Sequence, residues 1–390
     1  MTERIEAGLR RVPGLDLAQP LPESDPRLLA RIGDEIRAAG PMTFARFMDL
    51  ALYDPEAGYY AGEATAAERR DATGPGRGGD FLTAPEGHPI FGWTIARRLE
   101  ALWAELDRPG RFVIREHGAG SGALAVGILD GLRRSARSML EAVRYQAIDV
   151  SPRAARAFAQ AIEAAGLANH VEPADDRPAP GAILANELLD ALPVHRVEGT
   201  ADGTLLERFV ILGRDGALAT ELGPPSTPAL AARLASEGIA LTPRQAAEIC
   251  LAVDAWVGAA VAPLDRGLLL VIDYGAEATD LYASGRGSTL RAYHRHRVHD
   301  DPLVAIGRQD LTAHVDLTAL ERAAVAAGLA PLRRTTQSQY LSDLGLGELL
   351  VGLQSAPGAS LASYLEARSA VVRMLDPRAT GGFAVREFGR

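Results

Sequence analysis

The sequence contains no lysine, so all 41 of its basic residues are arginine. The absence of lysine excludes a Walker A nucleotide site, a Schiff-base enzyme and any reaction that uses lysine as a general base. The single cysteine, Cys250, excludes an internal disulfide framework and a zinc site built on several thiolates. The longest apolar run, near residues 267–272, is far shorter than the roughly 20 residues that a membrane helix needs.

Acidic residues outnumber the arginines, and the formal net charge of the 390-residue chain is −9. Tight binding to DNA depends on neutralising phosphates, so this balance argues against nucleic acid and mildly favours a neutral or cationic ligand. The first residues form no apolar leader, and Glu3 and Glu6 are unlike an arginine-rich transit segment. We therefore expect a cytoplasmic protein that binds neither nucleic acid nor membrane.

The residue patterns divide the chain into a helical region and a longer α/β region. Residues 1–105 read as helices and long loops, with apolar residues at helical spacing over residues 25–39 and again over 44–52. Residues 61–80 are rich in glycine and form a candidate lid, which we expect to be mobile. We expect residues 1–105 to cover the substrate and residues 106–390 to form the catalytic domain.

The second region alternates short β-branched runs with helical segments. The predicted strands lie over residues 112–114, 145–150, 182–185 and 267–273, and the predicted helices over 122–132, 152–166, 246–262 and 317–327. This spacing predicts an α/β fold with a doubly wound parallel sheet, in which the loops after the strands meet at one edge. Residues 195–245 interrupt the pattern and predict an inserted α+β segment. We expect a final strand region over residues 332–340, with helices after it.

Three glycines, Gly118, Gly120 and Gly122, follow the first of these strands and begin the first helix. Glycine lets the backbone turn sharply and approach a ligand closely, and the helix N-terminus adds free N–H groups. The loop alone also fits the dinucleotide fingerprint. S-adenosylmethionine and NAD are therefore both candidates at this point.

Polar residues at three strand ends favour S-adenosylmethionine. Glu116 stands before the first glycine, where it can bind an ammonium group but would repel a pyrophosphate. Asp149 ends the next strand and can accept both hydroxyls of a ribose. Asn186 begins a polar run after the third strand, beside the expected position of a reacting methyl group. An NAD-dependent oxidoreductase ranks well below a methyltransferase on this evidence.

The chain resembles the MidA family of S-adenosylmethionine-dependent methyltransferases over residues 36–327. The blocks that carry the resemblance are residues 40–44, 58–60, 79–86, 116–122, 149–152, 186–194, 272–275, 290–293 and 311–316. That family includes a mitochondrial protein-arginine methyltransferase that helps to assemble respiratory complex I. The resemblance implies a class I methyltransferase sheet with Rossmann-like topology, S-adenosyl-L-methionine as cofactor, S-adenosyl-L-homocysteine as product, and a protein arginine as acceptor. It also implies that Thr83 and Pro85 lie beside the cofactor.

The chain departs from the family pattern at several positions. Residues 87–88 and 294–299 differ, His117 and Ala119 vary the glycine loop, and Asp149 replaces a glutamate. An aspartate binds a ribose equally well, so we expect cofactor binding to be retained. A small natural product or a peptide is therefore an alternative acceptor, and a cofactor-binding assembly factor with little catalysis is an alternative function. A homodimer is an alternative to a single chain.

Methylation of a guanidinium requires a carboxylate that holds the planar group and accepts the proton that leaves. Glu86, Glu187 and Asp190 are the candidates, and the last two would share one face of a helical turn. Asp190 is equally typical of an ordinary acid at a helix N-terminus. His314, oriented by Asp316, is a candidate general base, and a buried structural histidine is the equal alternative.

The remaining patterns argue against other enzyme classes. His294, His296 and His299 lack a regular ligand spacing, so we expect no metal site. The chain contains no G-x-S-x-G elbow, which argues against an α/β-hydrolase. The run that begins at Asn186 also lacks the Pro-Pro-aromatic sequence that is typical of enzymes that methylate nucleic-acid bases.

Overall fold

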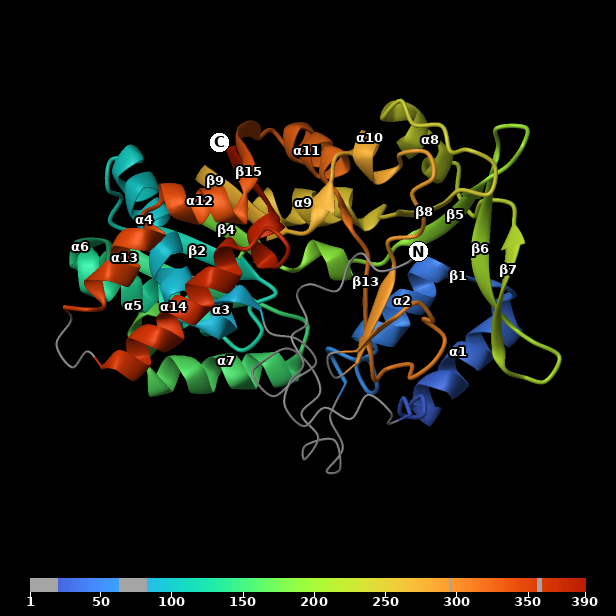
Figure 1. Cartoon of the computed structure of the whole chain (residues 1–390), viewed down its shortest axis with the longest axis horizontal. Helices are drawn as coiled ribbons and strands as arrows, with labels where there is room; N and C mark the ends of the chain where they lie inside the picture. The colour runs from blue at the N-terminus through green and yellow to red at the C-terminus, as the bar shows by residue number, and fades with distance from the viewer. Residues whose placement is uncertain (1–19, 63–82, 295–296, 356–359) are drawn as a thin grey trace.

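The computed structural model describes residues 20–62, 83–294, 297–355 and 360–390, which build two sheets with helices around them (Figure 1). The larger sheet has six strands in the order β15-β16-β9-β4-β2-β3. Their bounds are β2 Phe112–His117, β3 Val143–Ile148, β4 Ala179–Asn186, β9 Leu264–Asp273, β15 Ala330–Thr336 and β16 Ala384–Gly389. Four neighbouring strands, β3, β2, β4 and β9, pair in parallel, and β16 runs antiparallel between β9 and β15.

Side chains from successive residues of these strands enter two different cores, as the alternation along a β-strand requires. Ile114, Leu184 and Leu270 pack with α4 Ile90–Glu105 and α5 Ala123–Ser135. On the other face, Ile183 and Leu269 pack with α9 Ala252–Val261 and α11 Leu317–Ala326. Because both faces are covered, the strands are almost continuously apolar.

The remaining helices of this part of the molecule lie beside the same sheet. Their bounds are α3 Ala84–Gly87, α6 Arg137–Ala142, α7 Pro152–Ala164, α12 Gln337–Asp343, α13 Leu346–Gly352 and α14 Leu361–Leu375. Gly92 of α4 faces Gly127 of α5, and a Cβ on Gly92 would lie 2.6 Å from the Gly127 backbone. These glycines allow the two helices to cross in close contact.

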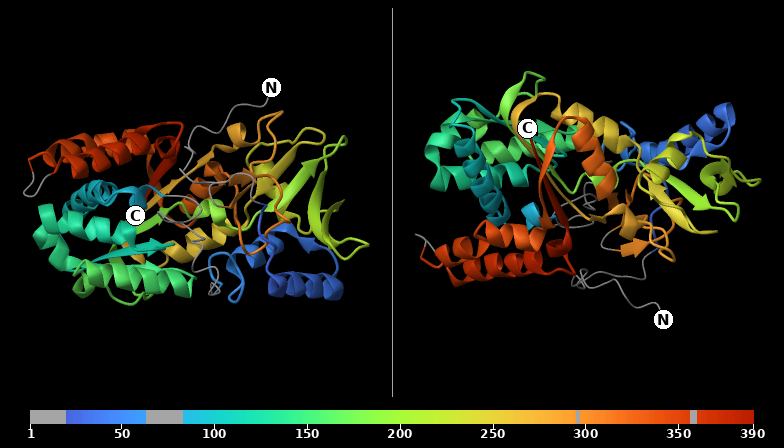
Figure 2. Two further views of the ribbon diagram at one scale, coloured as in Figure 1. Left: turned by 60° about the horizontal axis from the view of Figure 1, so that its bottom comes forward. Right: turned by 90° about the horizontal axis from the view of Figure 1, so that it is seen from above.

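The smaller sheet lies at the far end of the molecule from α6 and α13 (Figures 1 and 2). It pairs β1 Met42–Thr43, β5 His195–Gly199, β6 Leu205–Leu212, β7 Leu218–Gly223 and β8 Ala246–Ile249. The helices α1 Pro26–Ala39 and α2 Phe44–Tyr53 share a core with β1 and β6. Asp25 caps α1 and Thr43 caps α2 through their side-chain oxygens. Helix α8 Ala229–Ser236 follows β7.

The segment between β9 and α11 lies beside the carboxyl ends of the strands. It consists of β10 Gly275–Ala276, α10 Ala278–Leu281, β11 Arg291–His294, β12 Arg297–His299, β13 Asp310–Thr312 and β14 Val315–Asp316. None of the helices in the described ranges combines the length and the apolar character needed to cross a bilayer. Most of the glycine-rich stretch over residues 61–80 lies outside the described residues.

Two predicted elements are wrong and a third is wrong in part. The strand region expected over residues 332–340 is a strand only as far as Thr336, and residues 337–340 begin α12. The single helix expected over residues 246–262 is instead the strand β8 followed by α9, because residues 246–249 pair with β5 and this pairing overrides their helix propensity. The C-terminal strand β16 was expected to be helical. Two charged residues, Arg386 and Glu387, interrupt the apolar pattern that a core strand shows in the sequence. Both are buried in the structure, where Arg386 pairs with Glu277 and Glu387 with Arg98.

The order of the strands places a topological switch at β2. The chain leaves β2 to form β3 on one side and returns to form β4 on the other. In open α/β sheets, ligands bind outside the carboxyl ends of the strands at such a point. The glycine loop after β2 and the polar run after β4 therefore face the same crevice.

Candidate functional site

The loop between β2 and α5 has a backbone that only glycine adopts easily. Gly118, Gly120 and Gly122 have φ angles of 72°, 52° and 79°. A Cβ on Gly118 would lie 2.9 Å from Leu188 Cδ1, and one on Gly122 would lie 3.2 Å from Phe158 Cα. The loop therefore passes close to its neighbours. It also uses N–H groups within the protein, since Gly118 donates to the Ile148 carbonyl at 2.8 Å and Gly122 to the Ala119 carbonyl at 2.9 Å.

Asp149, just beyond the end of β3, is held against this loop. Its Oδ2 accepts a hydrogen bond from the Gly120 N–H at 2.9 Å, and its Oδ1 accepts one from the Ser151 N–H at 2.8 Å. Each oxygen keeps a further lone pair for a ligand hydroxyl. The Ser151 hydroxyl also donates to the Tyr60 carbonyl at 2.6 Å, which ties residue 60 to this edge.

A cavity of about 370 Å³ lies between Asp149 and helix α7. Its walls are apolar apart from Asp149 and Glu172, and come from Ala119, Ala147, Ala154, Ala155, Phe158 and residues 171–174. This volume and this mixture of apolar wall with a few polar groups are typical of cofactor pockets.

Glu116 has a partner that the sequence did not indicate. Its side chain is buried, and its Oε2 accepts a hydrogen bond from the Tyr145 hydroxyl at 2.7 Å. Burial raises the pKa of Glu116 to about 8, the Tyr145 hydrogen bond opposes this, and the charge of Asp149 adds to it. A cationic ligand group beside Glu116 would lower this pKa and favour the carboxylate.

Glu187 follows β4 with a φ angle of 51°, an unusual value for a residue with a side chain. Its N–H donates to the Ile272 carbonyl at 2.8 Å, and its Oε1 accepts from Asn186 Nδ2 at 3.2 Å and from the Ala84 N–H at 3.4 Å. Burial, and then the charge of Asp190, raise the pKa of Glu187 to about 8. The strained backbone suggests a functional constraint at this position.

Helix α3 brings Glu86 to the glycine loop. Glu86 Oε1 accepts a hydrogen bond from the Ser121 hydroxyl at 3.0 Å, and its Oε2 accepts from the Thr83 hydroxyl at 3.1 Å. Pro85 is buried within the same short helix. Since Ala84 contacts Glu187, α3 connects the loop after β2 with the residues that follow β4.

Asp190 lies in the 3₁₀ turn Leu189–Ala191 and is buried. The Tyr274 hydroxyl hydrogen-bonds its carboxylate, and burial raises the pKa of Asp190 to about 6 despite this bond. Glu187 and Asp190 do not share a helical face as predicted, because Glu187 lies before the turn with a left-handed backbone. They are nevertheless close enough for the charge of Asp190 to raise the pKa of Glu187.

Asp273, which ends β9, fixes the turn that carries Asp190. Its Oδ2 accepts hydrogen bonds from the N–H groups of Leu188, Leu189 and Asp190 at 3.1, 2.8 and 3.3 Å. Its Oδ1 accepts one from the Tyr274 N–H at 2.8 Å. No local pattern in the sequence indicates this role of Asp273, because residues 188–190 lie more than 80 positions away from it along the chain.

Several tyrosines surround the same turn. Tyr53 donates to the Ala191 carbonyl at 2.9 Å, and Tyr60 donates to Asp310 Oδ1 at 2.8 Å. Their rings stack with centroids 5.8 Å apart. The charge of Asp190 also raises the pKa of Tyr293, after burial. Carboxylates and aromatic rings together favour a cationic group at this place.

His314 lies beside Tyr274, and no acidic side chain among the described residues hydrogen-bonds its ring. Arg286 Nη2 is 3.4 Å from its Nδ1, and Asp316 caps α11 instead by accepting from the Ala319 N–H at 3.0 Å. Burial, and then the charges of Arg286 and Arg291, lower the pKa of His314 to about 4. The ring is therefore a weak base at neutral pH.

Two of the three histidines near residues 294–299 lie in the described residues, His294 on β11 and His299 on β12. His294 Nδ1 lies 2.8 Å from the Arg308 carbonyl oxygen, and His296 lies outside the described residues. Among the residues that the structure describes, no group of three His, Cys, Asp or Glu side chains is placed to hold a metal ion.

Residues 94–335 match the family model of S-adenosyl-L-methionine-dependent methyltransferases. The chain is 30% identical to a fruit-fly protein, the Drosophila melanogaster homologue of mitochondrial protein arginine methyltransferase NDUFAF7, with 77% of this chain and 70% of that protein covered. It is 29% identical to NDUFAF7 of Mus musculus, with 82% and 74% covered.

Two solved structures from Burkholderia thailandensis are also similar. One, bound to S-adenosyl-homocysteine, is 33% identical with a TM-score of 0.83. The other, a native structure, is 31% identical with a TM-score of 0.80, and each comparison covers 95% of both chains. These matches confirm the predicted fold class.

The predicted cytoplasmic location is wrong, because the named relatives are mitochondrial proteins. The prediction depended on the absence of an apolar leader and on Glu3 and Glu6, which are unlike an arginine-rich transit segment. The absence of an apolar leader says nothing about mitochondria, since import into them uses amphipathic, arginine-rich segments rather than apolar ones.

Proposed function

Because the chain belongs to the MidA-like family of S-adenosyl-L-methionine-dependent methyltransferases, we propose that it methylates an arginine side chain of a protein. The named relatives are protein arginine methyltransferases. The observation that carries the proposal for this chain is the pair of Asp190, which is buried, and Glu187, which is partly buried, two carboxyls with raised pKa values beside the glycine loop and among tyrosines.

The residues at the edge of the large sheet fit the cofactor. The cavity beside Asp149 suits the adenosine, the carboxylate of Asp149 suits the ribose hydroxyls, and the N-terminus of α5 suits the methionine carboxylate. Glu116 suits the methionine ammonium. The Asn186 Oδ1 atom is buried and has no hydrogen-bond partner among the described residues, so it is free to bind a ligand donor here.

When bound, S-adenosylmethionine supplies an electrophilic methyl group. The task of the chain is then to position a guanidinium nitrogen and to accept its proton. In the ligand-free protein Glu187 holds a proton at neutral pH, because its pKa is raised to about 8. The positive charge of a bound guanidinium lowers this pKa and releases that proton, so that the carboxylate can accept the proton that the methylated nitrogen loses. Asp190, fixed by Asp273 and Tyr274, holds the positive charge of the acceptor nearby.

The remaining predicted catalytic residues have lesser parts in this proposal. Glu86 uses both of its oxygens on Thr83 and Ser121, so it positions α3 against the glycine loop. His314 is a weak base with a pKa near 4, so it contacts Tyr274 and shapes the site without accepting the proton.

Mass spectrometry of cells that lack the chain tests the proposal. We expect methyl-arginine to disappear from one protein, to return with the wild-type chain and not to return with Glu187→Gln. Loss of one small methylated metabolite instead would indicate a small-molecule acceptor. If Glu187→Gln fully restored function in cells, the assembly-factor alternative would replace the enzymatic one.

A further inference from the structure

Arg115 is a buried cation in the middle of strand β2. It is 1% exposed and lies on the opposite face of the sheet from Glu116. Burying a charge is costly unless it is well hydrogen-bonded. Main-chain carbonyls offset part of this cost, since the nearest carboxylate oxygen, Asp175 Oδ1, is 3.9 Å away. The Arg115 Nε is buried and has no hydrogen-bond partner among the described residues.

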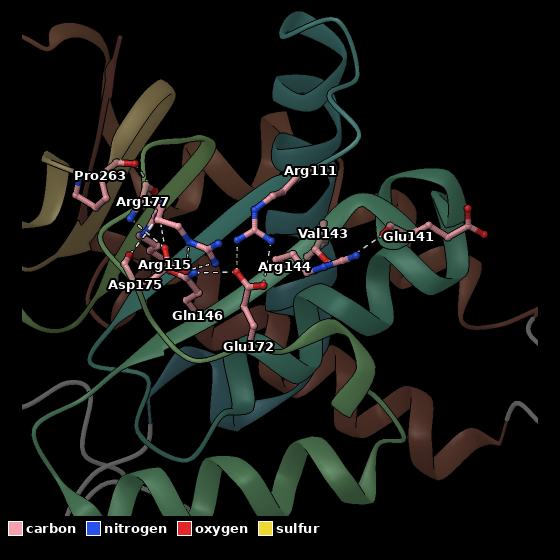
Figure 3. A network of polar contacts seen from close by, with 10 residues as sticks. All are labelled: Arg111, Arg115, Glu141, Val143, Arg144, Gln146, Glu172, Asp175, Arg177 and Pro263. Atoms are coloured by element: carbon pink, nitrogen blue, oxygen red, sulfur yellow. Dashed lines mark hydrogen bonds and ion pairs between the residues drawn. The ribbon is translucent and has the colours of Figure 1, made fainter.

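The carbonyls that Arg115 binds lie in two segments of the chain. Nη2 donates to the Arg177 carbonyl at 2.8 Å and to the Asp175 carbonyl at 3.5 Å, and Nη1 donates to the Pro263 carbonyl at 3.2 Å (Figure 3). Pro263 lies just before β9, and residues 175–177 lie just before β4. One side chain therefore holds an irregular segment against the centre of the sheet.

That segment forms one wall of the cavity described above. Residues 172–178 have no regular secondary structure, and residues 172–174 line the cavity opposite Gly120 and Asp149. Its main chain is linked to the sheet by the hydrogen bond from the Glu172 N–H to the Tyr145 carbonyl at 3.0 Å. Side chains must therefore provide most of the remaining anchorage.

A second anchor acts at the start of the same segment. Figure 3 shows Arg111 and Gln146 converging on Glu172. Arg111 Nη1 is 3.0 Å from Glu172 Oε2, and Gln146 Nε2 is 2.9 Å from Glu172 Oε1. The Arg111 hydrogen bonds lower the pKa of Glu172, so this carboxylate stays ionised and paired. The wall is thus held at both ends, at Glu172 and at residues 175–177.

We propose that Arg115 is a positioning residue for the cofactor, because it fixes the wall of residues 172–177 against which the adenosine binds. This inference rests on the proposed placement of the cofactor in the cavity beside Asp149. Arg115 does not line the cavity itself and acts only through the carbonyls of Asp175 and Arg177.

Titration calorimetry of the full chain with S-adenosylhomocysteine tests the proposal through Arg115→Met. This change removes the carbonyl contacts together with the buried charge, so it need not lower stability. We expect the Kd to rise about tenfold. Amide hydrogen exchange should become faster over residues 172–178 and stay unchanged in α5, a local effect that general destabilisation would not produce.

Arg115→Lys is the second variant and decides the question if Arg115→Met does not fold. One ammonium cannot reach the carbonyls of Pro263 and Arg177 together, so we expect a weaker effect in the same direction. Arg144→Met is the matched control. Among the described residues, Arg144 hydrogen-bonds the nearby carbonyls of Glu141 and Val143, at 3.0 and 2.7 Å, and its loss should leave the Kd unchanged.

Asp149→Ala distinguishes a failure of the positioning role of Arg115 from a failure of the proposed cofactor site. If Asp149→Ala loses S-adenosylhomocysteine while both Arg115 variants bind and exchange like the wild type, the positioning role is overturned and the cofactor site stands. If Asp149→Ala and the Arg115 variants all bind like the wild type, the cofactor is not in this cavity and both proposals for it are wrong.

Discussion

The proposed cofactor side and the proposed acceptor side of this crevice are built in different ways. On the cofactor side, Glu116, the three glycines and Asp149 lie within 34 consecutive residues on two neighbouring strands. On the acceptor side, Tyr53, Asp190 and Tyr274 come from three distant parts of the chain. Binding of a cofactor that a whole family shares can depend on a short local motif. An acceptor site assembled from distant segments can then change without disturbing that motif. Glu187 lies where the two sides meet.

The largest effect is expected from Glu187→Gln, which should slow methylation without weakening the binding of the cofactor. The amide keeps the size of the side chain but cannot accept the proton. We expect the methylation rate to fall about a thousandfold while the affinity for S-adenosylhomocysteine stays near the wild-type value. Rates and titrations on one preparation measure both. Glu141→Gln, on the exposed surface of α6, is the control, and an equal loss of cofactor binding in Glu187→Gln would contradict the division.

Gly122→Val should weaken ligand binding on the proposed cofactor side. A side chain there must adopt a φ of 79° and would approach Phe158. We expect the affinity for S-adenosylhomocysteine to fall about a hundredfold. Gly258→Ala in α9 is the matched control, because nothing lies within 4 Å of its added Cβ. Wild-type affinity in Gly122→Val, measured by calorimetry, would show that the loop does not bind the ligand.

Glu187, which lies where the two sides meet, should make the stability of the ligand-free protein depend on pH. The pKa of Glu187 is raised from 4.5 to about 8 by burial, so between these values the folded chain holds a proton that the unfolded chain has lost. Stability therefore falls as pH rises through this range. We expect the melting temperature to drop between pH 6 and pH 8, with a smaller drop in Glu187→Gln. Identical pH profiles for the two proteins would contradict the raised pKa.

The smallest effect is expected far from the crevice. Thr43 caps α2, and its Oγ1 accepts a hydrogen bond from the Arg46 N–H at 3.2 Å. Thr43→Ala should cost about 1 kcal/mol of stability in denaturant unfolding. The affinity for S-adenosylhomocysteine should not change, because the cofactor side lies on the other sheet. A change in that affinity would show that the two sheets are coupled.

The parts that the sequence predicted are those fixed by local interactions. Strands β2, β3 and β4, the glycine loop and Asp149 follow from short patterns of residues. The Tyr145 hydroxyl on Glu116, the Asp273 carboxylate on residues 188–190 and the place of β16 between β9 and β15 join residues 29 to more than 80 positions apart. The buried pairs of Arg386 and Glu387 also made β16 look unlike a core strand. No single-sequence pattern reports such contacts.

A crystal structure of the full chain with S-adenosylhomocysteine tests the central claim most directly. We expect density for the adenosine between α7 and residues 171–174, with the ribose on Asp149 and the sulfur directed toward Glu187. Density for the ligand at any other place, or a sulfur remote from Glu187, would contradict the assignment of the cofactor side, the acceptor side and the residue that joins them.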